Sequence, residues 1–285
     1  MNIVNLQNRL ANGKWMLERR ALYSFYDTVQ NLSSIKVGGL QSLLFGNPLV
    51  AKMQDHPVQT SSGGSSAGDM AIIQVSGILT KSPGEAEAEL LGLCDTDEIS
   101  MALDAAVNDA SVRSIVMAFN SPGGDTVGIA ELGRKIKAID SIKPVYSWTE
   151  TCMASAAAWL GSEARLIGMT ETAHVGGCGV YMMVLDASAK YKSEGIRPQV
   201  ISSGKWKMLG SDTNPLSDEE QEYLQSDVDK QHQTFKDVVK ENRPTIKEEA
   251  LEGLSYEGPE ALQVGWADVM AEDFDEFLAH ITTQQ

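Results

Sequence analysis

The chain has few of the residues that bind metal ions. Its 285 residues include three cysteines and four histidines, and the cysteines (Cys94, Cys152 and Cys178) form no CxxC pair and no Cys/His cluster. Zinc sites are built from such pairs at short spacing, so the sequence predicts none. Three is also an odd number, which fits reduced thiols in a cytoplasmic protein better than a framework of disulfides.

Long apolar runs are missing as well. The first 15 residues lack the uninterrupted apolar core of a secretory signal. Residues 40–50 form an apolar stretch, but Asn47-Pro48 interrupts it, and it is shorter than the ~20 residues that cross a bilayer. We therefore expect a cytoplasmic protein without a membrane anchor.

Positive charge is scarce and unevenly placed. Lys and Arg number 23 against 39 Asp and Glu, and the net charge of −16 argues against nucleic acid as the main partner. Residues 1–53 nevertheless hold six Lys or Arg and two acids. A basic segment on an acidic body predicts docking onto the body itself or onto an acidic partner, and a solvated basic helix face is the plain alternative.

Three segments differ in composition. Apolar residues recur at helical spacing over residues 5–33, which predicts one or two amphipathic helices within an N-terminal extension, residues 1–54. Residues 55–69 are rich in Ser and Gly and predict a linker. Over residues 70–285, β-branched apolar runs alternate with helical patterns, which predicts an α/β domain with a mostly parallel sheet under helices.

The pattern predicts the elements of this domain in order. Strands are expected over residues 71–79, 114–119, 145–149, 165–169, 179–185 and 199–202. Helices are expected over residues 97–110, 126–139, 153–161, 187–195, 216–242, 259–265 and 267–280. The start of the longest helix is marked by Ser217-Asp218-Glu219-Glu220, a capping signature.

A serine among alanines and a glycine-rich turn are the strongest candidates for chemistry. Ser155 lies at the expected start of a helix, and by itself it is more typical of an N-cap or a small packing residue than of a nucleophile. The turn Asn120–Asp125 (NSPGGD) follows a buried strand, where glycines let a ligand approach the backbone. Backbone N–H groups of Gly124 and Ala156 could then hold an oxyanion. Cys178 is a weaker alternative nucleophile, since a free cysteine is usually buried.

A serine nucleophile also needs a base. His174 is the one credible histidine, and Asp186 or Asp212 would have to fix its tautomer. The other candidates are Lys205 and Lys207, because an apolar environment can lower the pKa of a lysine until it loses its proton. The residues alone leave the choice open.

Four motifs, in this order, resemble those of the protease IV or signal peptide peptidase A family and its phage prohead-protease branch: NSPGGD, the Ser155 segment, GGCGV at residues 176–180, and SGKWK at residues 203–207. The resemblance covers about residues 70–269. It implies Ser155 as nucleophile, Lys207 as general base, and oxyanion donation from the backbone of Gly124 and Ala156. It further implies a Clp/crotonase fold of repeated ββα units, ring-shaped homo-oligomers, and neither a metal nor another cofactor.

The chain departs from that family at one position. Members usually carry a serine in the glycine motif, whose hydroxyl helps to orient the lysine, and here that position is Gly177. A Ser-His-Asp triad through His174, as in the related Clp proteases, therefore stays open. Two readings without proteolysis also remain: an acyl-CoA enzyme of the crotonase type, and a weakly active structural ring or scaffold partner.

The expected function is thus a serine endopeptidase with a Ser-Lys dyad. The phage branch predicts cleavage of scaffold and capsid proteins inside the prohead, in the host cytoplasm, and a cellular signal-peptide-peptidase-like protease is the alternative. In the phage reading, the basic N-terminal extension would target the enzyme to shell or scaffold. Residues 60–68 are a candidate site of self-cleavage, being small and exposed.

Overall fold

A seven-stranded sheet forms the centre of the molecule. The computed structural model describes residues 14–17, 69–84, 87–88 and 91–283. The main path of this sheet runs β11-β9-β7-β5-β2, with β8 beside β7 and β12 beside β8. All pairings are parallel except that of β11 with β9. The strands are β2 (Met70–Ser76), β5 (Ser114–Ser121), β7 (Val145–Ala154), β8 (Leu166–Met169), β9 (His174–Gly176), β11 (Ser255–Glu257) and β12 (Val269–Met270).

A smaller, five-stranded sheet has the order β10-β1-β6-β3-β4. Strands β4, β3 and β6 are parallel, whereas β1 pairs antiparallel with both β6 and β10. Its members are short: β1 (Lys14–Leu17), β3 (Ile78–Thr80), β4 (Leu93–Asp95), β6 (Gly123–Asp125) and β10 (Tyr181–Met182).

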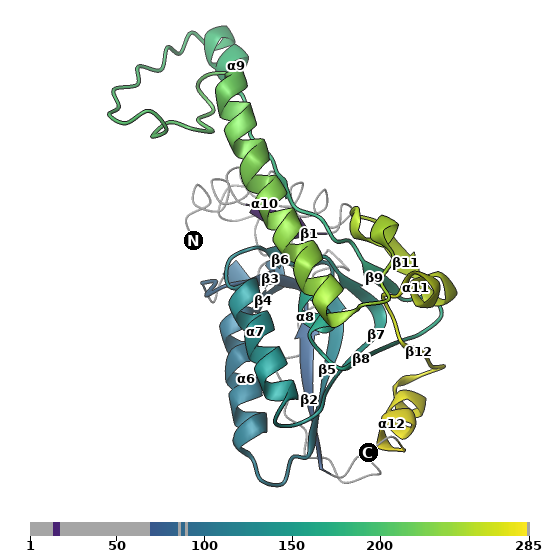
Figure 1. Ribbon diagram of the computed structural model, residues 1–285. Coiled ribbons are helices and arrows are strands. Elements are labelled where there is room, and N and C mark those ends of the chain that lie inside the picture. The colour runs from purple at the N-terminus through teal and green to yellow at the C-terminus, as the bar shows by residue number, and fades with distance from the viewer. Residues whose placement is uncertain (1–13, 18–68, 85–86, 89–90, 284–285) are drawn as a thin grey trace, which may run out of the picture.

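Helices cover one face of the large sheet, and a further helix covers the other. Figure 1 shows α6, α7 and α8 side by side, with the lower end of the long helix α10 over α8. Trp159 of α8 stacks on Phe235 of α10, with ring centroids 5.0 Å apart. On the opposite face, α12 packs Phe277 against Trp148 of β7 at 4.8 Å. The helices are α6 (Thr96–Asn108), α7 (Ile129–Asp140), α8 (Ala156–Ser162), α9 (Ser188–Ser193), α10 (Asp218–Asn242), α11 (Gly258–Val264) and α12 (Phe274–Thr282), with a 3-10 turn at Glu248–Leu251.

The chain repeats one ββα unit. In each of the first two units a strand of the large sheet is followed by short strand structure of the small sheet and then by a helix: β2, β3, β4 and α6, then β5, β6 and α7. Gly77 and Gly123, both at φ 101°, stand where the chain leaves one sheet for the other. This bend requires a left-handed backbone, which a glycine adopts without strain. The expected α/β architecture of repeated ββα units is confirmed.

Most expected elements are present with shifted ends. The strand expected over residues 71–79 is two strands, because Gly77 turns the chain into the other sheet. The segment 267–280 is not one helix, since β12 pairs with β8 before Asp273 caps α12. Burial on both sides explains the continuous apolar run of β5, which lies between β2 and β7 and under the helices.

Two expectations about secondary structure are wrong. Residues 199–202 form no strand, because they lie exposed in the segment between α9 and α10 and have no strand to pair with. Lys14–Leu17 form a strand although residues 5–33 have helical periodicity, because β6 and β10 pair with this segment on both sides. The rest of the expected extension, 1–54, and the linker up to residue 68 lie outside the described residues.

Candidate active site

Ser155 stands at a strained, buried position between a strand and a helix. It follows the last residue of β7 and precedes α8, and it has φ 57° and ψ −121°. Few non-glycine residues have a positive φ in the part of the chain that the structure describes, and Ser155 is one of three. Its side chain is 2% exposed. Such a sharp strand-to-helix turn is the way in which many hydrolases present a nucleophilic serine.

The NSPGGD turn lies directly against Ser155. A Cβ placed on Gly123 would stand 2.8 Å from the Ser155 Cβ, and one placed on Gly124 would stand 2.0 Å from the Leu79 carbonyl oxygen. Neither position has room for a side chain. Ser121 fixes the turn, since its hydroxyl donates to the Gly77 carbonyl at 2.7 Å and accepts the Gly123 N–H at 3.2 Å.

The GGCGV loop lies on another side of the same serine. The Ser155 N–H donates to the Gly176 carbonyl at 2.7 Å, and the Gly177 N–H donates to Leu254 at 2.7 Å. A Cβ on Gly177 would be 3.2 Å from the Ser155 nitrogen and 3.4 Å from the Ser255 Oγ. A hydroxyl from β11 therefore lies next to the position where the family pattern has its own serine.

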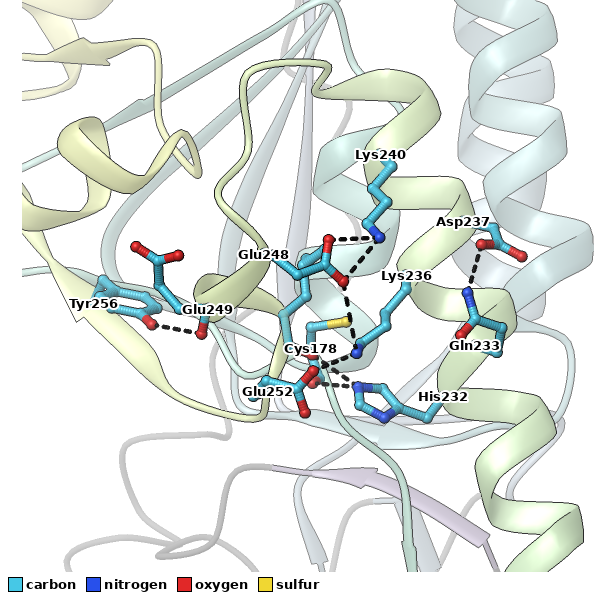
Figure 2. Close-up of polar contacts among 11 residues, drawn as sticks. Cys178, His232, Gln233, Lys236, Asp237, Lys240, Glu248, Glu249, Glu252 and Tyr256 are labelled. Carbon is cyan, nitrogen blue, oxygen red and sulfur yellow. Dashed lines mark hydrogen bonds and ion pairs between the residues drawn. The ribbon is translucent and has the colours of Figure 1, made fainter.

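A histidine on α10 holds this loop in place. Figure 2 shows His232 reaching from α10 to the loop, where its Nε2 lies 3.1 Å from the Cys178 carbonyl oxygen and 2.8 Å from that of Leu251. Both neighbours are acceptors, so Nε2 carries the proton and donates. His232 is thus a tether between α10, the glycine loop and the 3-10 turn, and its ring is engaged by the backbone.

A group of ion pairs surrounds this tether. Lys236 pairs with Glu252, and Lys240 pairs with Glu248 at 2.6 Å (Figure 2). The hydrogen bond from Lys236 lowers the pKa of Glu252, and in return Glu252 raises the pKa of Lys236. These charges belong to the link between α10 and the 3-10 turn, and Lys236 is not available as a neutral base.

Cys178 is unsuited to be a nucleophile. It is fully buried under α10, and burial raises the pKa of its thiol to about 12. Only the thiolate attacks carbonyl carbon, so this thiol is inert at neutral pH. Cys94 is in the same condition, since burial raises the pKa of its thiol to about 12 as well.

His174 is also poorly equipped for the triad reading. Its register position on β9 is opposite Cys152, its side chain is 44% exposed, and its Nδ1 lies 3.6 Å from Glu257. The two expected acid partners are engaged elsewhere. Asp186 accepts the Ser188 N–H at 2.9 Å, and Asp212 accepts the Tyr191 hydroxyl at 2.6 Å.

The SGKWK motif does not join the other three in this chain. Lys207 is exposed in the segment between α9 and α10. Figure 1 shows this segment at the outer end of α10, whereas α8, which begins after Ser155, lies beneath the other end. Lys205, its neighbour in the motif, pairs with Glu219 of α10 and lies 4.6 Å from the Trp206 ring centroid.

Sequence reasoning missed two neighbours of the site. Ser255 follows an ordinary loop, and nothing in its local sequence indicates that β11 will pair with β9. Met16, in β1, brings its carbonyl oxygen to 2.1 Å from the Cβ position of Gly123. For β1 the sequence contained one indication: the basic charge of residues 1–53 was a reason to expect that this segment docks onto the acidic body.

A comparison with family models decides the family. The model described as peptidase family S49 matches residues 137–282, which is more than half of the chain and includes Ser155 and the two later motifs. The chain belongs to peptidase family S49.

Several relatives of this S49 chain are known. It is 32% identical over 178 residues to the MJ0651 protein of Methanocaldococcus jannaschii, covering 61% of this chain and 57% of that protein. It is 30% identical over 208 residues to the capsid assembly protease C of Escherichia phage lambda (72% and 47%). It is 26% identical over 202 residues to the head-tail preconnector protein GP5 of Enterobacteria phage P21 (70% and 40%). The S49 chain therefore spans about half the length of these relatives.

Solved structures give weaker likenesses. The 1510-N membrane protease of Pyrococcus horikoshii, specific for a stomatin homolog, has a TM-score of 0.39 and 16% identity, over 74% of this chain and 77% of that one. An enoyl-CoA hydratase of Shewanella pealeana has a TM-score of 0.47 and 10% identity, over 84% and 77%. Within the described residues of the S49 chain, no helix is long and apolar enough to cross a membrane. The same residues contain no group of three or more His, Cys, Asp or Glu able to hold a metal ion.

Proposed function

We propose that this S49 chain is a serine endopeptidase in which Ser155 is the nucleophile and Lys207 the general base. The observation that carries the proposal is the strained, buried Ser155 held between two glycine motifs. Its backbone conformation costs free energy, and strain of this kind persists at sites where function requires it. Membership in family S49 supports the same reaction class.

The reaction is acyl transfer to the serine followed by hydrolysis. Neutral Lys207 takes the proton from the Ser155 Oγ as that oxygen bonds to a peptide carbonyl carbon. The N–H groups of Gly124 and Ala156 hold the oxyanion. The peptide C–N bond then breaks, and the lysine gives its proton to the leaving amine. Water then attacks the acyl carbon while the same lysine takes its proton, and the lysine returns that proton to the Ser155 Oγ as the acyl–oxygen bond breaks.

The base comes from a second copy of the chain. Lys207 is exposed, and its neighbours lie at the N-terminal end of α10, where Lys205 pairs with Glu219 and Trp206 stacks on Tyr223. Since α8 packs against the other end of α10, a single chain does not bring this segment to Ser155. The segment that carries Lys207 also exposes apolar side chains: Ile196, Val200, Ile201, Trp206 and Met208. An exposed group of this kind marks a contact surface. Burial in that contact would provide the apolar environment that a lysine needs to lose its proton.

The substrates fit the capsid-assembly branch of the family. Two of the relatives are named for roles in phage head assembly, a capsid assembly protease and a head-tail preconnector protein. The proposed substrates are scaffold and capsid polypeptides, cut within the prohead in the host cytoplasm. A role like that of protease 4 of Haemophilus influenzae, which is 25% identical over 70% of this chain, is the second candidate.

Casein hydrolysis by single variants tests the dyad. Ser155→Ala and Lys207→Ala are expected to be inactive across about pH 6 to 10, whereas His174→Ala keeps activity. Loss of activity in His174→Ala with an active Lys207→Ala would move the base to the histidine. Cleavage of phage scaffold protein rather than signal peptides would separate the two substrate classes.

A further inference from the structure

A gap one strand wide lies beside Ser155, between β6 and β10. Neighbouring strands in a sheet are about 4.8 Å apart, and β1 is the strand that joins these two. Within the described residues, β10 has no other neighbour in its sheet. The edges of β6 and β10 therefore offer backbone groups on both sides of an inserted extended chain, which is the arrangement of peptide recognition by strand addition.

The register brings the resident strand to the nucleophile. Met16 pairs with Gly124, the proposed oxyanion donor, and Leu17 pairs with Gly123. The Met16 carbonyl oxygen and the Ser155 Cβ lie 2.1 Å and 2.8 Å from the same point, the Cβ position of Gly123. The two atoms are therefore no farther apart than the sum of these distances. A backbone carbonyl oxygen of the resident strand thus lies close to the serine.

The resident strand is anchored by its side chains as well as by its backbone. Trp15 and Met16 are 3% and 2% exposed. Trp15 is opposite Asp125 on one side and Tyr181 on the other, so it spans both edges of the gap. Burying a large apolar side chain favours binding. The gap therefore favours extended peptides with large apolar residues at these two adjacent positions.

We infer that Lys14–Leu17 are a tethered, substrate-like strand in the peptide-binding groove of this S49 chain, and that substrates must displace it. The inference rests on the proposed role of Ser155. The strand is held by pairing with β6 and β10 and by burial of Trp15 and Met16. In one chain the segment that holds Lys207 lies at the N-terminal end of α10, so the strand occupies the groove while the proposed base is elsewhere. Because the strand belongs to the same chain, it competes with free peptides at an effective concentration that dilution does not change.

A disulfide reports occupancy without any catalysis. Lys14 and Met182 are register partners, and partners in an antiparallel pair lie within reach of a disulfide. In the full chain carrying Ser155→Ala, the pair Lys14→Cys and Met182→Cys is expected to cross-link within one molecule on mild oxidation. The matched control is Lys14→Cys with Met101→Cys, on the exposed face of α6. Cross-linking no faster than the control, or only between two molecules, would overturn the inference.

Kinetics of the active enzyme provide a second test of the inference. Met16→Asp places a charge in a buried position of the groove, so it releases the strand, and KM for an apolar peptide substrate is expected to fall about 5- to 10-fold. Met101→Asp, the same change at an exposed position, leaves KM unchanged. A synthetic peptide of residues 11–20 is expected to inhibit the released variant competitively. Unchanged KM in Met16→Asp contradicts the inference. A wild-type enzyme without activity would count against the proposed function, while the cross-link still decides occupancy.

Discussion

At the scale of single residues, the glycines near Ser155 differ in how much room they leave for a side chain. A Cβ on Gly124 would lie 2.0 Å from a backbone oxygen of β3, which cannot move without unpairing the small sheet. A Cβ on Gly179, in the other glycine motif, would meet its nearest neighbour at 3.5 Å, an ordinary contact. Two glycines near the site therefore differ sharply in what they tolerate.

Gly124→Ala is expected to lower kcat/KM at least about 100-fold, the cost of losing one oxyanion donor. The added methyl forces β6 away from Leu79 and moves its N–H from the serine. Gly179→Ala is the matched control and is expected to retain activity. Both are measured by peptide hydrolysis, with circular dichroism to establish that each variant is folded. A folded Gly124→Ala with wild-type activity would remove Gly124 from the oxyanion hole.

Ser255 supplies a hydroxyl beside Gly177, where the family pattern has a serine. We expect it to be a positioning residue for the base, acting on kcat and not on substrate binding. Ser255→Ala is expected to lower kcat about 10-fold, equivalent to about 1.4 kcal/mol of barrier, with KM unchanged. Ser255→Thr keeps a hydroxyl and is expected to restore most of the rate. Equal losses in both variants, or a change confined to KM, would indicate a packing role instead.

At the scale of elements, α10 is fastened to the body at its C-terminal end. Arg243 is buried there, where it donates to Asp268 at 2.6 Å and to the Ala164 carbonyl at 2.7 Å. Asp268 also accepts the Ile167 N–H of β8 at 2.7 Å. Burial lowers the pKa of Arg243, and the Asp268 carboxylate opposes that shift. This pair joins the long helix to the large sheet.

Arg243→Ala is expected to lower the free energy of unfolding by about 3 kcal/mol, because it removes the guanidinium that donates to the Asp268 carboxylate and to the Ala164 carbonyl. For a domain of this size the melting temperature would fall by roughly 6–12 °C. Arg134→Ala removes an exposed arginine paired with Glu131 on α7 and is expected to change stability by less than about 0.5 kcal/mol. Thermal denaturation measures both, and equal effects would refute the anchoring role.

Glu163, at the end of α8, gives a stability change that depends on pH. Burial raises the pKa of this carboxyl, and Asn242 donates to it at 2.8 Å. The folded state therefore carries a penalty above the raised pKa, which disappears as the pH falls below the ordinary value near ~4.3. Glu163→Gln is expected to raise the melting temperature near pH 8, with a gain that shrinks toward pH 4. The exposed Glu194→Gln is the control. A gain independent of pH would point to packing rather than charge.

Some elements could be predicted from the local sequence, because a cap or a single apolar run is enough to specify them. The capping box of Ser217 and Glu220 forms as its sequence indicates, and it starts α10 at Asp218. The strand β5 follows from one apolar run. In contrast, β1 and the segment 199–202 were predicted wrongly, because a strand exists only where partners offer free edges. Three of the four motifs meet at or beside Ser155, but the contribution of Ser255 depends on a pairing 79 residues away in sequence, between β11 and β9.

At the scale of the whole molecule, the chain has a body that holds the proposed nucleophile. It also has a projecting segment, residues 194–217 between α9 and α10, that holds the proposed base. Ile201, in this segment, is 100% exposed. Trp206 stacks on Tyr223 of α10 at 5.0 Å, so the segment is attached to the helix while its apolar side chains face outward. In the proposed arrangement, a second copy of the chain offers both a cover for this surface and a serine for Lys207.

Mixing two inactive variants tests this arrangement directly. Ser155→Ala keeps its base and Lys207→Ala keeps its nucleophile. When a copy of each meets, one of the sites they form joins an intact Ser155 to an intact Lys207 across the contact. An equimolar mixture is therefore expected to recover about a quarter of wild-type activity or more, as random assembly in pairs predicts. A chain carrying both changes, mixed with either single variant, is the control and stays at background. Full inactivity of the mixture, in a sample shown to contain mixed oligomers, would mean that the dyad forms within one chain by movement of α10 and its projecting segment toward α8.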